Sequence, residues 1–451
     1  MKIAWFTPFS TKSAIGKYSQ SITNDLIKHC EVDLWLSEET NLIPTELKIF
    51  HYQPNDDLLQ KLKDYDLVIY NMGNYLDFHK DIYEVSKKIK GVVILHDFVM
   101  HHFFIGYYLV HKNDTNAFLR EMEILYGENG RDIATDSVNG KRTPVWDTDE
   151  VIKYPFFEKA IEGAKGVVVH SRFHANEVIK RFLGPVEVIS HPFYSYDVSI
   201  NNSQISKADL GIPEDKILMI TIGHVNPNKR IDRVIKILGD NKELAKKIIY
   251  LIIGSYDEHS QYFLSLQSLA EKYNLQKAVK FLGFQPDNLL YAYMSNADIF
   301  VNLRFPAMEG ASWSLIEELY FGKPVIATDA GFYSELPDDC IIKISVDKEE
   351  EDLLKAFKKL VYEYKIRKNI GIKGRQFAIE NFSAQKYSQK FLKFLDKVKN
   401  WEPVLELVDK VSIELALLGI SQDTEVFDKI ADEIYRMMRS NAIFSTALEM
   451  L

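Results

Sequence analysis

The strongest constraint on the fold of this chain is a repeated alternation of short apolar runs with helical stretches. The runs read apolar throughout, which is typical of strands in parallel sheets covered by helices on both faces. One group spans residues 2–6, 32–36, 66–70, 91–95, 166–170 and 186–190, and a second spans 217–223, 248–254, 278–283, 297–303, 323–328 and 340–345. The sequence therefore predicts an α/β protein with two separate parallel sheets.

A polar stretch separates the two groups of strands. Residues 190–216 carry Pro192 and Pro213 and lack hydrophobic periodicity, so we interpret them as an interdomain linker. A chain of 451 residues is too long for one core, and two domains are expected. We predict a first Rossmann-like domain over residues 1–195 and a second over 205–380.

The first domain carries a helical insertion over about residues 98–164, and its many aromatic residues predict an enlarged core or a covering helix. A surface that faces a substrate or a membrane stays open as the alternative. Residues 381–399 are expected to form a helix that crosses back to the first domain.

The tail over residues 400–451 shows helical spacing of apolar residues in two stretches with Gly419 between them, which predicts a helical hairpin. Docking on the body or on a second copy would cover these residues, so a homo-oligomer stays open. The two stripes are Val404, Leu407, Val408, Val411, Leu415 and Leu418, then Phe427, Ile430, Ile434, Met437 and Met438.

Composition excludes several classes of protein. A net charge of −9 and a pI near 5.8 argue against a nucleic-acid binder. Cys30 and Cys340 stand far apart and build neither a disulfide framework nor a cysteine-based zinc site. The N-terminus shows no signal-peptide pattern, and the apolar run 248–253 is too short to span a bilayer. We expect a cytoplasmic protein, with peripheral contact at the inner face of the membrane left open.

The stretch "LRFPAMEGASWSLIEELYFGKPVIAT" is the most informative for function. Glu309 follows a buried strand, at the edge of a parallel sheet where ligands bind. The next residues, Gly310, Ala311 and Ser312, let a ligand approach the start of the following helix closely. A helix N-terminus offers unpaired N–H groups and partial positive charge, which suit a diphosphate.

Glu317 lies eight positions after Glu309 and has two interpretations. The segment from Ser314 to Glu317 matches a capping box, in which the glutamate satisfies a backbone N–H. Alternatively, its carboxylate accepts hydrogen bonds from paired hydroxyls on a ribose or sugar.

A second signal, "ITIGHVNPNKRIDRVIK", places a strand end at Gly223 and Lys229 at the start of the next helix. That lysine would face the same cleft as Glu309 and neutralise phosphate charge, or be a solvated surface lysine. Arg230 and Arg233 are expected on the surface. A third signal is a loop with Gly16 after the first strand, which is a candidate for phosphate or acceptor contact.

His96 and Asp97 follow an apolar strand, and the position of His96 points into the predicted cleft. Two metal sites are possible, and neither is favoured. One would combine His96 and Asp97 with His101 and His102, and the other would use Asp147 and Asp149, which serve equally well as helix caps.

Taken together, these stretches resemble glycosyltransferase family 4, whose members adopt the two-Rossmann GT-B fold. Glu309 and Glu317 are spaced as in the E-x7-E motif of that family, and residues 322–339 follow as expected. Residues 222–232 resemble the phosphate-binding turn, 281–300 the nucleobase region, and 92–97 the histidine-bearing strand end. The likeness spans about residues 1–395.

The resemblance implies roles for individual residues. Lys229 would bind the donor diphosphate, in a turn that includes Gly223 and His224. Glu309 would contact the donor sugar, next to Gly310, Ala311 and Ser312. Glu317 would hold ribose hydroxyls, and His96 would touch the sugar and help at the transition state. The backbone near Phe284 would meet the base, and the loop at Gly16 would lie by the diphosphate and acceptor.

Two departures from the family pattern are visible. His224 stands where the family usually has an arginine, and Arg304 and Arg172 are candidates to replace that charge. Residues 310–313 read Gly-Ala-Ser-Trp where the family often has Gly-Phe-Gly-Leu, so the sugar-facing shape differs.

The resemblance implies a retaining glycosyltransferase of hexosyltransferase type. It would move sugar from a nucleotide-diphosphate sugar, such as a UDP- or GDP-sugar, to a glycan, a lipid-linked glycan or another glycoconjugate, as in polysaccharide biosynthesis. No cofactor, no metal and no nucleic-acid partner are expected. The alternatives are a GT-B nucleotide-sugar epimerase and a non-catalytic glycosyltransferase-like partner subunit.

Overall fold

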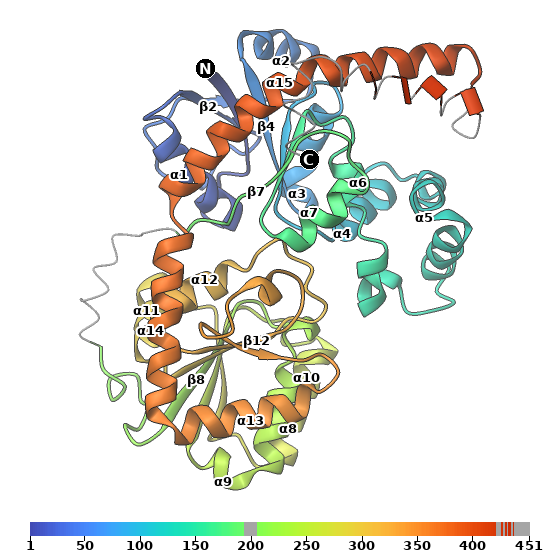
Figure 1. Cartoon of the computed structure of the whole chain (residues 1–451). Coiled ribbons are helices and arrows are strands. Elements are labelled where there is room, and N and C mark those ends of the chain that lie inside the picture. Colours follow the sequence, from blue (N-terminus) through green and yellow to red (C-terminus); the bar gives the residue numbers. More distant parts are fainter. Residues whose placement is uncertain (194–204, 421–424, 427–428, 431, 434–435, 437–451) are drawn as a thin grey trace.

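The computed structural model of the chain describes residues 1–193 and 205–420 and, within the tail, 425–426, 429–430, 432–433 and 436 (Figure 1). These residues form two α/β units, each built on one parallel sheet. The predicted fold class is thereby confirmed. Residues 194–204, in the central part of the predicted linker, lie outside the described residues.

The first sheet has seven parallel strands in the order β3-β2-β1-β4-β5-β6-β7. Its strands are β1 (Lys2–Phe6), β2 (Glu31–Leu36), β3 (Ile49–His51), β4 (Leu67–Met72), β5 (Val92–Leu95), β6 (Gly166–Val169) and β7 (Val186–Val188). The edge strand β3 was not predicted, because its three partly exposed residues leave no apolar run to recognise. Every residue of β4 is buried, as a central strand covered on both faces requires.

The second sheet has six parallel strands in the order β10-β9-β8-β11-β12-β13. They are β8 (Ile217–Ile222), β9 (Ile248–Ile253), β10 (Val279–Gly283), β11 (Ile299–Asn302), β12 (Val325–Thr328) and β13 (Ile342–Ile344). Apolar side chains on its two faces belong to two different clusters, so helices cover both faces. These helices are α8 (Ile231–Asp240), α9 (Lys242–Ala245), α10 (Gln261–Lys272), α11 (Asp287–Asn296), α12 (Trp313–Tyr320), α13 (Glu349–Tyr362) and α14 (Tyr364–Asn381), with short turns η6 (Pro227–Lys229) and η7 (Gly331–Glu335).

A helical segment stands between β5 and β6 of the first sheet, where the insertion was expected. Its elements are α4 (His101–Ile105), η2 (Gly106–His111), α5 (Thr115–Val138), η3 (Val145–Asp147), η4 (Asp149–Lys153) and α6 (Phe157–Ala160). Its aromatic side chains Phe103, Phe104, Phe118 and Phe156 are buried in the cluster that also covers one face of the sheet. These aromatic residues therefore enlarge the core of the first domain. The other helices here are α1 (Ala14–Leu26), α2 (Asp56–Lys61), η1 (Leu62–Asp64), α3 (Leu76–Ser86) and α7 (Arg172–Ile179).

The last long helix, α15 (Ala384–Leu417), returns to the first domain and packs beside α1 (Figure 1). Phe391, Phe394 and Val398 are buried in one cluster with strand β1. The helix continues without a break through Pro403, so the boundary predicted between residues 399 and 400 is wrong. The first helix of the predicted hairpin is the continuation of α15. Apart from Ile430, the residues predicted for the second helix lie outside the described residues.

Across the described residues, no helix combines the length and the apolar character that crossing a bilayer would require.

Candidate active site

Backbone hydrogen bonds join the two domains where β5 and β11 end. The N–H of Gly310 donates to the carbonyl of His96 at 2.8 Å, and the N–H of Phe98 donates to the carbonyl of Met308 at 3.0 Å. A Cβ atom on residue 310 would lie 2.6 Å from the His96 carbonyl oxygen, so only glycine allows this approach. The carboxyl ends of the two parallel sheets therefore meet, as the prediction of one shared cleft requires.

A cavity of about 440 Å³ lies beside this junction. Three of the predicted site residues line it: His96 from the first domain, and Glu309 and Ala311 from the second. Its wall also includes Lys12, Ser13, Ala14, Ile15, Asn74, Tyr75, Phe78, His79, Asp97, His191 and Trp313. We call it the central cavity. Both domains contribute to it, so a ligand held there would touch both.

His96 is buried in the floor of the central cavity. Its Nε2 atom lies 3.0 Å from Asn71 Oδ1, and the ring of Tyr18 stands edge-on with the ring centroids 4.6 Å apart. Burial, reinforced by the nearby imidazoles of His170 and His191, lowers the pKa of His96 well below its usual value. The next residue, Asp97, accepts a hydrogen bond from the Asn74 N–H at 2.8 Å. Burial raises the pKa of Asp97 to about 6, and Glu309 adds to that rise.

Glu309 is held by two groups of its own domain. The guanidinium Nε of Arg304 lies 3.2 Å from Glu309 Oε1, and the Tyr333 hydroxyl donates to the same oxygen at 2.6 Å. Arg304 is itself buried, and its Nη1 donates to the carbonyl of Leu303 at 2.7 Å. Arg304, one of the two candidates to replace the missing arginine charge, therefore belongs to the site. The backbone N–H groups of Arg172 and Phe173 instead donate to Glu335 at the other side of the domain junction.

Lys229 ends the turn η6 and is only 5% exposed. Its ammonium donates to the carbonyl of Ile222 at 2.6 Å, and a Cβ on residue 223 would lie 2.8 Å from Lys229 Nζ. Gly223 has a φ of 102°, a conformation that favours glycine. Burial lowers the pKa of Lys229 well below its usual value, and the charge of Arg304 acts in the same direction, whereas Glu309 and Glu318 oppose it. Lys229 is not among the residues that line the central cavity.

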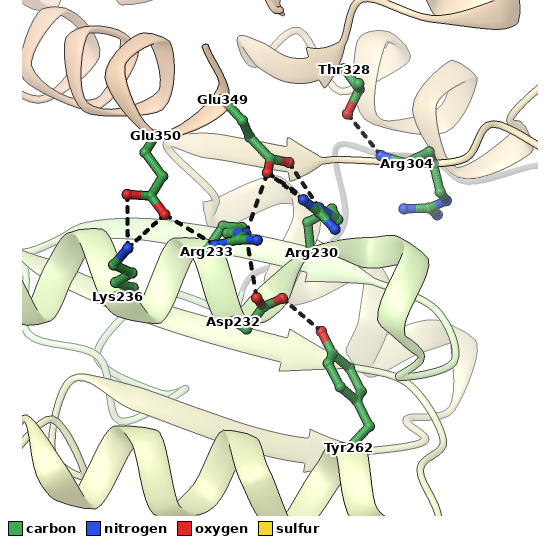
Figure 2. Close-up of polar contacts among 9 residues, drawn as sticks. All are labelled: Arg230, Asp232, Arg233, Lys236, Tyr262, Arg304, Thr328, Glu349 and Glu350. Carbon is green, nitrogen blue, oxygen red and sulfur yellow. Dashed lines mark hydrogen bonds and ion pairs between the residues drawn. The ribbon is translucent and has the colours of Figure 1, made fainter. Parts of the chain in front are cut away.

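Ion pairs fix the turn that carries Lys229 (Figure 2). Arg230 adopts a left-handed conformation with φ of 55° and makes a two-pronged contact with Glu349, at 3.0 and 2.7 Å. Arg233 and Lys236 from α8 contact Glu350. Arg230 and Arg233 were predicted to be surface residues, and this is wrong for Arg230 because the pairing keeps it half-buried. The network ties the start of α8 to the start of α13.

Helix α12 begins two residues earlier than the capping-box interpretation requires. Ser312 is the N-cap, and its Oγ accepts the N–H of Leu315 at 3.3 Å. Ser314 lies inside the helix, where its Oγ accepts from Asn302 Nδ2 at 2.9 Å. The capping box is therefore wrong, and Glu317 is not used as a cap. Burial raises the pKa of Glu317 to about 8, although the charge of Lys17 opposes the rise.

Glu318, the neighbour of Glu317, was not singled out from the sequence. It is completely buried, and its Oε2 accepts from Asn302 Nδ2 at 2.9 Å. Burial raises its pKa to about 8, while Asn302 and the charges of Arg304 and Lys229 oppose the rise. A sequence signal existed, because Glu318 falls on the apolar stripe of Leu315 and Leu319.

Three other predicted donor-binding residues lie elsewhere. Gly16 is not in a loop: it lies in the first turn of α1, where its N–H donates to Ser13 Oγ at 3.2 Å. A Cβ there would touch Ile43, Pro8 and Ser10, so Gly16 serves close packing of the loop against the helix. His224 is exposed, with Nδ1 3.0 Å from Ser255 Oγ. Phe284 follows β10 and is 78% exposed.

A second cavity of about 380 Å³ lies between the insertion and the second domain, and we call it the side cavity. Its wall combines Trp146, Asp147, Asp149 and His102 with Asn226, Asn228, Arg230 and Phe305. The side-chain oxygens of Asn226 and Asn228 are buried and accept no hydrogen bond from the described part of the chain. Met308 lines the side cavity and Glu309 lines the central one, so the two cavities lie next to each other.

His96 and His101, two candidate metal ligands, do not face a common site. His101 is buried with Nδ1 2.6 Å from the Tyr154 carbonyl oxygen, whereas His96 faces Asn71. Within the described ranges, no group of three or more histidine, cysteine, aspartate or glutamate side chains is arranged to hold a metal ion.

Comparisons with known proteins agree with this geometry. Residues 202–377 match the family described as "Glycosyl transferases group 1". "Uncharacterized glycosyltransferase MJ1069" of Methanocaldococcus jannaschii is 25% identical over 255 residues, which cover 54% of this chain and 63% of that relative. The matched region thus spans less than two thirds of that relative's length.

Solved structures show the same fold. Anabaena Alr3699/HepE in complex with UDP superposes with a TM-score of 0.60 and 17% identity, over 88% of this chain and 100% of that chain. WaaG, "a glycosyltransferase involved in lipopolysaccharide biosynthesis", has a TM-score of 0.57 and 15% identity, over 86% and 98% of the two chains. At these identities the likeness establishes the two-domain GT-B architecture.

Proposed function

We propose that this chain is a retaining glycosyltransferase of family 4 that moves a hexose from a nucleotide-diphosphate sugar to a glycan or glycoconjugate, without a metal. The observation that carries the proposal is the meeting of both domains at one cavity. His96 comes from the end of β5, and Glu309 comes from the loop before α12. Ligands of open α/β sheets bind at these carboxyl ends.

Charge around the site favours an anionic ligand. Lys229 and Arg304 lie behind Glu309, and each is buried within the protein. Glu317 and Glu318, with pKa values of about 8, are mainly uncharged at neutral pH. Arg304 is paired with Glu309, and burial lowers the pKa of Lys229, so an added negative charge nearby would favour the protonated lysine. An entering diphosphate would supply that negative charge.

The proposed chemistry rests on positioning and charge stabilisation. As the bond between sugar and diphosphate breaks, negative charge grows on the leaving group. Lys229 and Arg304 do not line the central cavity and would act on that charge from behind Glu309, whereas the N–H groups at the start of α12 would stabilise it directly. Glu309 and His96 would hold the sugar, and the junction between the domains would exclude water. The UDP and UDP-glucose complexes of Anabaena Alr3699/HepE make a UDP-sugar the first donor to test.

We place the acceptor in the side cavity, which adjoins the central one. Its carboxylates, Asp147 and Asp149, would accept hydrogen bonds from sugar hydroxyls. Trp146 offers an aromatic surface for a sugar ring. Trp146→Ala should raise the KM for the acceptor and leave the affinity for the donor unchanged.

The first experiment is a thermal-shift screen across UDP-, GDP- and ADP-sugars. A donor that binds the folded chain raises its melting temperature according to its affinity. The turnover with that donor is then measured for the wild type, Lys229→Ala and Lys229→Met, with Lys242→Ala on the exposed face of α9 as the matched control.

We expect Lys229→Ala and Lys229→Met to lose roughly a hundredfold or more in turnover, because each removes one preorganised donor. Lys229→Met keeps the apolar stem, so loss in that variant cannot be attributed to a cavity. Equal turnover of Lys229→Met and the wild type would remove Lys229 from the mechanism. Isomerised sugar from donor alone would indicate an epimerase, and binding without turnover of any acceptor would indicate a non-catalytic subunit.

A further inference from the structure

A chain of hydrogen bonds runs under the central cavity and ends on a backbone carbonyl at each side. Asn71 Nδ2 donates to the carbonyl of Phe6 at 2.9 Å, and Asn71 Oδ1 lies 3.0 Å from His96 Nε2. His96 Nδ1 lies 3.3 Å from His170 Nε2. On the far side, His170 Nδ1 lies 2.9 Å from the carbonyl oxygen of Ile189. All of these side chains are buried, His170 to 2% exposure.

The carbonyl of Phe6 fixes which way the amide of Asn71 points. A carbonyl oxygen only accepts hydrogen bonds, so the group that faces it must be the NH₂ of Asn71. The amide oxygen then faces His96. Both ends of the histidine pair therefore meet acceptors: Asn71 Oδ1 on one side and the Ile189 carbonyl on the other.

Counting protons shows what this arrangement demands. The two outer ring nitrogens, His96 Nε2 and His170 Nδ1, must each carry a hydrogen to donate outward. A neutral imidazole has one N–H, so two neutral rings use both of their hydrogens at the ends. Two lone pairs would then face each other across 3.3 Å between His96 Nδ1 and His170 Nε2. One additional proton between these nitrogens satisfies all three contacts and gives the pair a single positive charge.

Burial opposes that charge while the cavity holds no anion. The pKa of His96 is well below its usual value and that of His170 is lowered to about 4, in both cases mainly because burial removes the ring from water. The hydrogen-bond pattern therefore favours the protonated pair, whereas burial favours the neutral pair. A negative charge nearby would shift the balance towards the protonated pair. The ionisable groups around the two rings are His79, His174, His191, Tyr18 and Tyr387, with Asp97 and Glu309 on the wall of the same cavity.

We propose that His96 and His170 act as one proton-holding pair, which takes up a proton from solvent when a nucleotide diphosphate enters the central cavity. The step rests on the proposed function, because that function brings the anion. His170 is a positioning residue: it lies behind His96 and acts on the ligand through it. The shared proton fixes the ring of His96 between Asn71 and His170 and adds positive charge beside the diphosphate. By linkage, donor binding and proton binding strengthen each other equally.

The first test is calorimetric titration of UDP-glucose near pH 5.5 in buffers of different ionisation enthalpy. The dependence of the binding heat on the buffer gives the number of protons taken up. UDP-glucose carries a diphosphate diester that does not titrate near neutral pH, so an uptake belongs to the protein. We expect an uptake of roughly half a proton or more in the wild type, and an affinity that falls up to about tenfold for each pH unit between about pH 4 and the raised pKa of the occupied pair.

His170→Gln removes the partner ring and should abolish most of this uptake. His174→Gln, a buried histidine outside the hydrogen-bond chain, is the matched control and should keep it. A merely structural role for His170 would change affinity and leave the proton count as in the wild type. Equal uptake in all three proteins, or none in the wild type, would overturn the proposal.

A measurement without ligand keeps the two proposals separable. In ¹⁵N spectra of the wild type labelled at histidine, the signals of His96 and His170 should change together over one acid transition. In His170→Gln, the transition of His96 should move to lower pH because the shared contact is gone. Independent titration of the two rings would refute the pair even if no nucleotide sugar binds. Joint titration without any nucleotide-sugar binding would keep the pair and refute the proposed function.

Discussion

Replacing Glu318 by glutamine tests the electrostatic account of the site most directly. The carboxyl group is completely buried, and its pKa is raised from 4.5 to about 8, chiefly by burial. The folded state therefore binds this proton more tightly than the unfolded state. The resulting stability is fully present below the unfolded pKa of 4.5 and is lost as the pH rises towards 8. Glutamine keeps the shape and cannot ionise, so the variant should not show this loss.

The shift sets the size of the effect. Each pKa unit corresponds to about 1.4 kcal/mol. Between pH 5 and pH 8, Glu318 should therefore lower the free energy of unfolding of the wild type by roughly 3 kcal/mol, and the variant should not show this decrease. For a domain of this size, about 1 kcal/mol moves the melting temperature by roughly 2 to 4 °C. We therefore expect Glu318→Gln to gain roughly 6 to 12 °C on the wild type between pH 5 and pH 8. Glu317, whose pKa is also raised, adds to the loss of stability in both proteins and cancels in their difference.

The assay is thermal unfolding of the ligand-free protein followed by circular dichroism at several pH values. Glu271→Gln, on the exposed side of α10, is the matched control and should follow the wild type. The buried histidines titrate alike in all three proteins, so their contribution cancels in the differences. If Glu318→Gln melts in parallel with the wild type at every pH, or below it at pH 8, then Glu318 is ionised in the folded protein. A neutral Glu318 beside Lys229 and Arg304 would then be refuted.

Further predictions concern the turn, the domain junction and the base. Glu349→Ala should lower the melting temperature and weaken donor binding several-fold, because Arg230 loses the two-pronged ion pair that holds its left-handed conformation. Glu350→Ala is the control, and it should cause a smaller change in both the thermal-shift and the binding assay. Gly310→Ala should cut turnover by about a hundredfold, because its Cβ would lie 2.6 Å from the His96 carbonyl oxygen and push the two domains apart. Unchanged kinetics would show that the close contact between Gly310 and His96 is not needed for turnover. Phe284→Ala should weaken nucleotide binding about threefold to tenfold without lowering stability, whereas Leu264→Ala, equally outside the core, should change neither.

The sequence predicted the two parallel sheets because their strands are apolar on both faces, a pattern that local composition records directly. It predicted His96, Glu309 and Ala311 on one cavity because each follows a strand, and parallel strands end at one edge. It did not predict the exact start of α12. Ser312 and Ser314 can each cap a helix, and the choice depends on Asn302, which binds the side chain of Ser314 from a neighbouring strand. A contact between residues so far apart leaves no local signal.

The partner of His96 illustrates the same limit for chemistry. His170 follows the strand β6, as His96 follows β5, but this position alone does not distinguish it from a structural histidine. Its significance comes from three acceptors and donors contributed by separate strands: Asn71 on β4, His96 after β5 and the carbonyl of Ile189 after β7. Because each strand supplies one group and the sheet sets their spacing, the proton count of the site belongs to the fold and not to any motif. A chain with the same motifs but an apolar residue at position 170 would keep the predicted donor contacts and lose the coupling between proton and donor.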